Sequence, residues 1–343
     1  MSELAAARRA AHALAMAPFA FQAACAARDL GVLAALAHTP ESTGAVAQRL
    51  GLPLTSVTTL LEACLAIDLV REDAGLWHAT TTGLVWLKDR QVAVDAAFAA
   101  EVCWSGLGAL TASLATATPQ GLRAHGPWTT VYAGLAQLPT RVRAAWDAYD
   151  HAHSDDAFPG AIRHLLASGP RRVLDVGANT GRFSAALLAA DPTVTMTLCD
   201  HAAQLDQARQ QVATHHARTC FVPGDLLDHT IPFPGAQDAV WMSQFLDCFA
   251  PSDVQALLLR ARAALAPGGS VWVLEPCSDR QSEPAAAASL RLASLYFTAI
   301  ANGVSRFYRS TELLAWAEVA GLRCTQSWDG LGTAHTLFRF TPV

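Results

Sequence analysis

The sequence has few charged residues and no basic cluster. Of its 343 residues, 15% are charged and 52% are hydrophobic, and the formal net charge is −5. A chain of this length and composition can build two domains with sizeable cores. The 24 lysine and arginine residues are scattered, so no basic face for nucleic acid or an anionic membrane is evident. The composition therefore favours a small molecule or another protein as the partner.

The sequence also lacks paired cysteines. It has no Cys-x-x-Cys motif and no Cys/His cluster at the spacing of a zinc site. The eight cysteines lie singly, at Cys25, Cys64, Cys103, Cys199, Cys220, Cys248, Cys277 and Cys324. Isolated cysteines of this kind are typical of reduced core residues. We therefore predict a cytoplasmic protein without a bound metal.

One stretch near the N-terminus lacks charge altogether. Arg8 and Arg9 precede a run from Ala10 to Ala27 with no formally charged residue. Twin arginines before an apolar run are also a feature of secretory signal peptides. This run is rich in alanine, contains His12 and Pro18, and continues without a break into a helical pattern. We predict a helix packed at an interface, without a membrane role.

Residues 30–89 have the pattern of three short helices followed by a small β element. Ser42 or Thr43 is placed to cap the second helix, and a turn is expected at Asp73 to Gly75 between β-prone residues. Three helices and a hairpin make a winged helix.

A winged helix often binds DNA. The expected second and third helices, Thr43 to Val70, carry only one basic residue, Arg49, which is too few for a phosphate-binding surface. We therefore predict that residues 1–105 form a winged-helix-like dimerisation domain, and DNA binding is the weaker alternative.

The remaining residues, 106–343, begin with a connector and then change pattern. Residues 106–160 mix helical text with glycine and proline breakers. From Arg171 onward, short apolar runs alternate with helix-like segments, and the runs are RRVLDVG, VTMTLCD, RTCFVPGD, AVWMSQ and SVWVLEP. This order predicts an α/β fold with a parallel, doubly wound sheet that binds ligands at the carboxyl ends of its strands.

A loop of small residues follows the first predicted strand. Small side chains from Gly177 to Gly181 let the backbone approach a ligand, and the next helix offers free N–H groups. A dinucleotide fingerprint would need glycine where the chain has Asn179 and Arg182, which argues against NAD or FAD.

Carboxylates end the second and third predicted strands. Asp200 can accept hydrogen bonds from both hydroxyls of a ribose, and Asp225 can meet an adenine ring. Each acid by itself is more often a helix cap. The loop and the two acids, in order after three successive strands, indicate a nucleoside site.

Three segments of the chain resemble motifs of a known family. VLDVGANTG, PFPGAQDAVWMSQ and LAPGGSVWVLEP resemble motifs of class I S-adenosylmethionine (SAM)-dependent methyltransferases, in the two-domain type of the small-molecule O-methyltransferases. Asn179 replaces the middle glycine of the first motif, and asparagine tolerates left-handed backbone angles. The resemblance covers nearly the whole chain. It implies a Rossmann-like sheet with an N-terminal dimerisation domain, and a homodimer that methylates phenolic or other aromatic small molecules in secondary metabolism.

The resemblance also implies the site residues. Asp200 would hold the ribose, Asp225 and Leu226 the adenine, and Gly177 and Gly181 the methionine end of SAM. The implied cofactor residues are Asp175, Gly177, Asn179, Gly181, Asp200, His201, Gly224, Asp225, Leu226, Ser243 and Gln244. The implied acceptor residues are Tyr149, Met242, Phe245, Tyr296, Phe297, Asn302 and Arg306.

The catalytic histidine of that family is absent. In the family it lies just beyond the fourth strand and takes the phenolic proton, and its position falls here on Asp247. A phenol with a pKa near 10 attacks better as phenolate, and a positioned base adds about 10²- to 10⁴-fold. The candidates are Asp247, His151 and His153. For Asp247, the alternative to a base is a purely structural role. For His151 and His153, the alternative is a solvated position in the connector.

Three more segments suggest a subgroup. WMSQFLDCF, LYFTAIANG and GLGTAHTL resemble a bacterial subgroup associated with aryl-polyene and related aromatic pigment pathways. That implies a hydroxyphenyl acceptor, free or carried as a thioester. Two alternatives within the fold are methylation of the ring carbon ortho to the phenol, and a relative that keeps the SAM pocket but does other chemistry.

Overall fold

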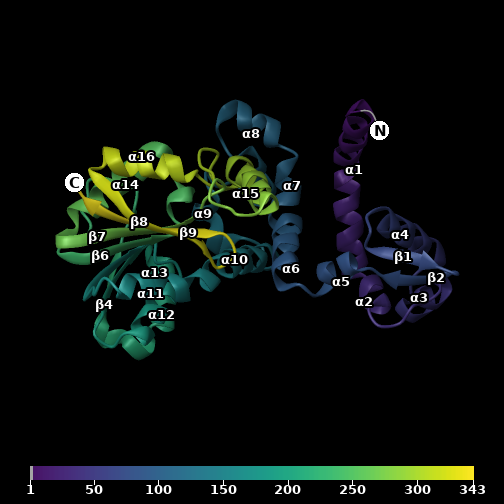
Figure 1. Cartoon of the computed structure of the whole chain (residues 1–343), viewed down its shortest axis with the longest axis horizontal. Coiled ribbons are helices and arrows are strands. Elements are labelled where there is room, and N and C mark those ends of the chain that lie inside the picture. The colour runs from purple at the N-terminus through teal and green to yellow at the C-terminus, as the bar shows by residue number, and fades with distance from the viewer. Residues whose placement is uncertain (1–2) are drawn as a thin grey trace. The chain divides into compact units, whose positions relative to one another are not determined.

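The structure is a computed structural model that describes residues 3–343. The chain divides into two compact units, Met1–Glu101 and Val102–Val343 (Figure 1). Each unit has its own secondary structure and is described by itself.

The first unit contains one long helix, several short helices and a hairpin. Its elements are α1 (Glu3–Asp29), α2 (Val32–Leu36), α3 (Thr43–Leu50), α4 (Leu54–Ala66), β1 (Val70–Asp73), β2 (Leu76–Ala79), α5 (Thr81–Lys88) and α6 (Arg90–Ala97). The hydroxyl of Ser42 caps α3 by accepting the N–H of Ala45 at 3.3 Å. Ala74 and Gly75 join the antiparallel strands with positive φ angles, as a two-residue hairpin requires. The predicted helices, cap and hairpin are therefore confirmed.

Helix α1 is largely exposed. Leu14 and Phe19 are 76% and 71% exposed, whereas Ala24 and Ala27 are buried against the rest of the unit. Within residues 3–343, two helices qualify as membrane spans by length and composition alone, α1 and Pro284–Ala301, or three if the bent pair Arg90–Leu107 and Leu110–Thr116 counts as one.

The second unit opens with connector helices. They are α7 (Trp104–Leu107), α8 (Leu110–Thr116), α9 (Val131–Gly134), α10 (Thr140–Ser154) and α11 (Phe158–Leu166). A π-helical turn, Phe98–Cys103, precedes α7, and short 3₁₀ turns separate several of these helices.

A seven-stranded sheet forms the centre of the second unit. Its strands are β3 (Arg172–Val176), β4 (Thr195–Asp200), β5 (Thr219–Pro223), β6 (Gln237–Ser243), β7 (Leu265–Pro276), β8 (Leu322–Leu331) and β9 (His335–Pro342). Their order is β5-β4-β3-β6-β7-β9-β8, and the first five are parallel. All five predicted strands and the α/β class are confirmed. The antiparallel hairpin of β8 and β9 at one edge was not predicted as a unit.

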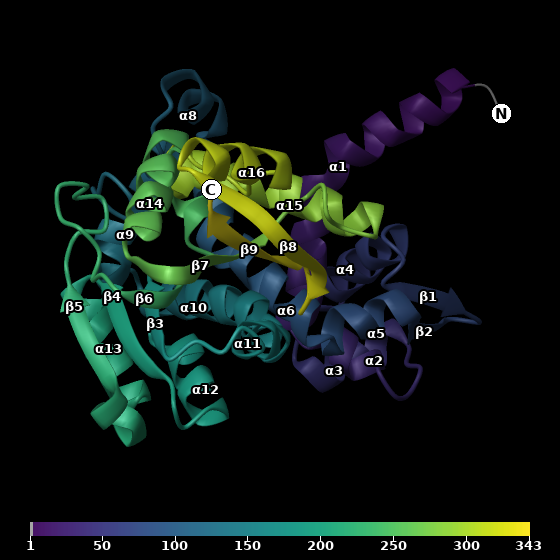
Figure 2. The same cartoon turned by 60° about the vertical axis from the view of Figure 1, so that its left-hand side comes forward.

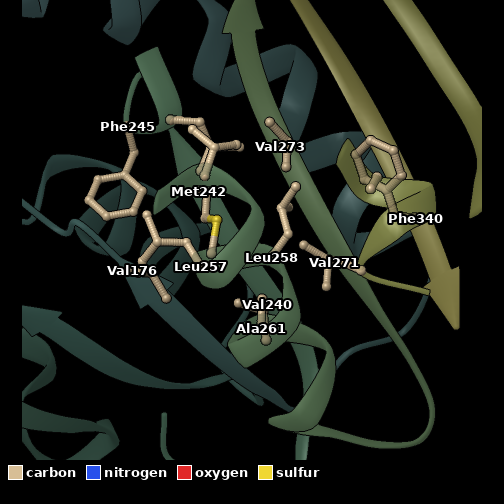
Figure 3. Close-up of a cluster of buried hydrophobic side chains, with 14 of the residues drawn as sticks. Val176, Val240, Met242, Phe245, Leu257, Leu258, Ala261, Val271, Val273 and Phe340 are labelled. Carbon is tan, nitrogen blue, oxygen red and sulfur yellow. The ribbon is translucent and has the colours of Figure 1, made fainter. Parts of the chain in front are cut away.

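Helices cover both faces of this sheet, as Figures 1 and 2 show. One face carries α11, α12 (Arg182–Ala190) and α13 (Ala202–Gln211), and the other carries α14 (Pro251–Ala263) and α16 (Ser310–Val319). In the core between the sheet and helices α14 and α16, Met242 of β6 packs with Val176 and Leu257, and Phe245 lies at the margin of this core (Figure 3). Because the central strands are buried on both faces, their sequences are continuous apolar runs.

The parallel strands bring their carboxyl ends to one edge of the sheet. The loops that follow β3, β4, β5 and β6 therefore meet there, as does the end of β7. Helix α15 (Pro284–Tyr296) and its π-helical continuation, Phe297–Ala301, follow β7 in the chain.

Candidate active site

The loop after β3 is a close-fitting cradle. Gly177 and Gly181 have φ angles of 75° and 78°, and Asn179 has 47°. A Cβ atom on Gly177 would lie 2.2 Å from the ring of Phe245, so only glycine fits there. Asn179 adopts the left-handed conformation that its tolerance for such angles allows.

Asp200 closes this cradle from the end of β4. Its Oδ2 accepts the N–H of Asn179 at 2.8 Å, and its Oδ1 accepts the N–H of His201 at 2.7 Å. Burial raises the pKa of Asp200, and these two hydrogen bonds oppose the shift. A carboxylate oxygen accepts more than one hydrogen bond, so both oxygens retain capacity for a ligand hydroxyl.

The Asn179 side chain ties three elements together. Its amide donates to Asp150 Oδ2 of α10 at 2.9 Å, and its carbonyl accepts from Gln204 of α13 at 3.0 Å. Neither partner was among the predicted site residues. Asp150 lies between Tyr149 and His151, so the sequence identified the segment but not this residue.

A cavity opens between this loop, α10 and the end of β6. Burial raises the pKa of Asp150 and of Asp175 to about 7, and Asp175 accepts the Ser184 hydroxyl at 2.6 Å. Ser243 Oγ and Gln244 Oε1 also line it, buried and without a hydrogen-bond partner in residues 3–343. Buried carboxyls are stabilised as anions by a nearby cation, and unpartnered oxygens accept from a ligand's N–H groups. The cavity thus fits the cationic methionine end of SAM.

The loop after β5 is more open. Gly224 and Asp225 are exposed, and Asp225 accepts the N–H of Leu227 at 2.9 Å. Leu226, expected to contact adenine, instead packs its side chain in the core, with 8% of it exposed. His201 is exposed at the start of α13.

A buried glutamate holds the loop after β6 by hydrogen bonds. Glu275 of β7 accepts the N–H groups of Phe245 at 2.9 Å and Leu246 at 2.8 Å through one oxygen, Oε1. Its other oxygen, Oε2, is buried without a partner in the described part of the chain. Burial and the charge of Asp247 raise the pKa of Glu275 well above its usual range. Sequence reasoning missed this residue, although it stands in the quoted run SVWVLEP.

Asp247 follows in the same loop. It is 4% exposed, in a 3₁₀ turn from Leu246 to Cys248, and its Oδ1 lies 3.4 Å from the Cys248 thiol. Burial raises its pKa, and the hydrogen bond from Cys248 opposes the shift. A carboxyl with a raised pKa is a better proton acceptor when ionised, which is the property of a general base.

The comparisons with known proteins agree with this geometry. Residues 158–322 match the model of the O-methyltransferase domain family. The chain is 28% identical over 288 residues to the L-tyrosine C(3)-methyltransferase of Streptomyces lavendulae, across 82% of this chain and 77% of that one. It is 26% identical over 308 residues to the 3-hydroxy-5-methyl-1-naphthoate 3-O-methyltransferase of Streptomyces sahachiroi, across 88% and 85%. Its fold is similar to that of the mitomycin 7-O-methyltransferase MmcR, with a TM-score of 0.76, 21% identity and coverage of 99% and 98%.

The chain is a SAM-dependent methyltransferase, and the match to the O-methyltransferase domain covers residues 158–322. It is a small-molecule O-methyltransferase of secondary metabolism, with SAM as its cofactor. The alternative of a relative without methyl transfer is therefore wrong.

The two histidines predicted as bases lie on α10 of the methyltransferase. His151 lines the cavity, with Nδ1 3.8 Å from Asp150 and 4.0 Å from Asp155, and burial lowers its pKa. The ring of His153 lies 4.4 Å from that of Tyr149. Their role as bases stays a prediction.

Two aromatic side chains predicted for the acceptor pocket, Tyr296 and Phe297, contact each other. Tyr296 accepts the indole N–H of Trp146 at 2.8 Å, and its ring packs edge-on to Phe297 at 5.2 Å. Asn302 donates to the backbone carbonyl of Cys248 at 2.7 Å. The segment after α15 therefore contacts the loop that carries Asp247.

Two predicted acceptor residues have other partners in the methyltransferase. Met242 is fully buried in the core between the sheet and α14, so it offers no surface to a substrate. Arg306 is exposed and forms an ion pair with Glu312 at 2.7 Å. The Met242 prediction counted a residue near a strand end without knowing which way its side chain points. The role of Arg306 toward the acceptor stays a prediction.

Proposed function

We propose that this methyltransferase acts on the hydroxyl group of a phenolic or other aromatic small molecule, with Asp247 as the base. The observation that carries the proposal is a buried carboxyl, with its pKa raised, in the loop where the family has a histidine. Two relatives are named for aromatic compounds, L-tyrosine and a hydroxynaphthoate, which supports an aromatic acceptor.

The residues of the cradle fit SAM, which supplies an activated methyl group when bound. Asp200 would accept the ribose hydroxyls, and Asp225 would lie beside the adenine. The backbone from Gly177 to Gly181 would approach the methionine end, and Ser243 and Gln244 would accept hydrogen bonds from it.

Asp247 would receive the proton of the acceptor hydroxyl. As that proton moves to the carboxylate, the oxygen lone pair forms the new bond to the methyl carbon, and the electrons of the broken C–S bond remain on sulfur. The enzyme must also hold the acceptor oxygen in line with that bond, which is the larger part of the task. The protonated Asp247 returns its proton to solvent after the product leaves.

A second candidate function is methylation of a ring carbon ortho to a phenol. The relative from Streptomyces lavendulae that is named for C(3)-methylation of L-tyrosine favours it. Both reactions begin from a phenolate, so both use the same base.

The remaining proposals concern the assembly, the location and the form of the acceptor. We propose a cytoplasmic homodimer formed through the Met1–Glu101 unit, because apolar side chains of α1 are exposed. An acceptor carried as a thioester and the aryl-polyene subgroup remain predictions, and the comparisons lend the subgroup no support.

Mass spectrometry with methyl-deuterated SAM tests the function. Free hydroxyaromatic acids, their thioesters and tyrosine would be incubated with the protein, and fragmentation would place the label on oxygen or carbon. Asp247→Asn should lower kcat by about 10²-fold or more, because a positioned base contributes on that scale, and should leave SAM affinity unchanged. Full activity of this variant between pH 6 and 9 would remove Asp247 from the role.

A further inference from the structure

We propose that Cys248 is a positioning residue that orients the Asp247 carboxyl through a hydrogen bond from its thiol to Asp247 Oδ1. The proposal rests on the proposed role of Asp247 as the base.

The direction of the bond follows from the donors available. The Cys248 sulfur lies 3.4 Å from Asp247 Oδ1 and 4.0 Å from the carbonyl oxygen of Gln244. A thiol has one proton to donate, and the carboxylate is the closer and stronger acceptor. Because a carboxylate oxygen accepts more than one hydrogen bond, this bond orients the Asp247 carboxyl and leaves capacity for the acceptor hydroxyl.

The backbone around Cys248 is fixed, so the thiol has a defined direction. Its N–H donates to the carbonyl of Phe245 at 3.1 Å, and its carbonyl accepts from Asn302 at 2.7 Å. The next carbonyl, of Phe249, accepts the Tyr308 hydroxyl at 2.7 Å. These bonds, together with the hydrogen bonds from the Phe245 and Leu246 N–H groups to Glu275, hold the whole loop.

The charges that face Asp247 explain why a neutral donor matters there. Glu275 of β7 and Asp150 of α10 both interact electrostatically with it, and like charges disfavour its ionised form. Tyr132 of α9 and Tyr308 also face it, and both are neutral because burial raises the pKa of each phenol. The Cys248 thiol is neutral for the same reason, so its proton stays available for donation.

Two substitutions test the bond. Cys248→Ala removes the donor to Asp247, and Cys248→Ser restores one. Cys324→Ala is the matched control, because the Cys324 thiol also donates at 3.4 Å, to the carbonyl of Gln326 in β8.

We expect Cys248→Ala to lower kcat by about three- to tenfold, the range that a neutral hydrogen bond provides. The acid limb of the kcat profile should move to higher pH, because losing a donor disfavours the ionised carboxylate. Cys248→Ser should recover most of the activity. KM for SAM and the behaviour of Cys324→Ala should match the unaltered enzyme. A change in packing alone would not move the acid limb.

A readout without an acceptor separates this proposal from the base assignment. In protein labelled with ¹³C at the aspartate carboxyls, the Asp247 signal is the one lost in Asp247→Asn, and its titration midpoint should rise in Cys248→Ala. An unchanged midpoint together with unchanged kcat would overturn the positioning role while leaving Asp247 as the base. Full activity of Asp247→Asn would instead overturn the base assignment, whatever the midpoint does.

Discussion

At the residue scale, the fit of single side chains decides cofactor binding. We predict that Asp200→Ala weakens SAM binding at least tenfold, because its carboxylate is placed for the ribose and holds the N–H groups of Asn179 and His201. Isothermal calorimetry measures this affinity. The control is Asp191→Ala, which removes a half-buried carboxylate that accepts the N–H and hydroxyl of Thr193, in the loop before β4. Equal affinity in the two variants would contradict the assignment.

The place of a residue in the site was predictable where a motif constrains the backbone. The small residues after the first strand indicated the cradle, and the positive φ of Asn179 agrees with the preference of asparagine for such angles. No local pattern pointed to Asp150 or Glu275, because their partners come from elements far away in the chain. Such pairings depend on how helices and strands pack.

At the element scale, the contact between β3 and α12 has a consequence for stability. Asp175 of β3 is 3% exposed and accepts the Ser184 hydroxyl of α12, and its folded-state pKa is about 7, against 3.8 for an unperturbed group. Its folded-state pKa is raised, so the native state binds the proton more tightly than the unfolded chain. Stability from this group is fully present below about pH 4 and is lost as the pH rises through 7.

We therefore predict that the protein without SAM is less stable at pH 8 than at pH 6. Asp175→Asn, which cannot ionise, should lose less stability over this range. The pH slopes of the free energy of unfolding of the two proteins should differ by at most roughly 1.4 kcal/mol per pH unit. Urea unfolding at several pH values measures both slopes. Parallel slopes would show that Asp175 does not titrate in this window.

The helices and strands were predictable because each follows from the spacing of apolar and turn residues within a short segment. The five parallel strands and the hairpin at Ala74 and Gly75 appear where apolar runs and turn residues predict them. The pairing of β9 with β7 was not predictable, because an antiparallel edge hairpin depends on where the chain returns after α16.

At the scale of the whole molecule, the exposed helix α1 bears on assembly. We predict a homodimer, with a mass by light scattering of twice the 36.3 kDa chain. Phe19 is 71% exposed on an apolar helix, so Phe19→Glu should shift the protein toward the monomer by placing a charge in an apolar contact. Val319→Glu, at a residue 73% exposed on α16, is the control. A dimer that survives Phe19→Glu unchanged would place the interface elsewhere.

The sequence by itself determined the fold class, the strands and the nucleoside loop, because periodicity and small residues act within a few positions along the chain. It also showed that the usual histidine is absent and put Asp247 in its position. Only the tertiary structure decided what surrounds that carboxyl. Glu275 and Tyr132 come from distant segments, and burial, which raises the pKa of Asp247, exists only once the elements have packed.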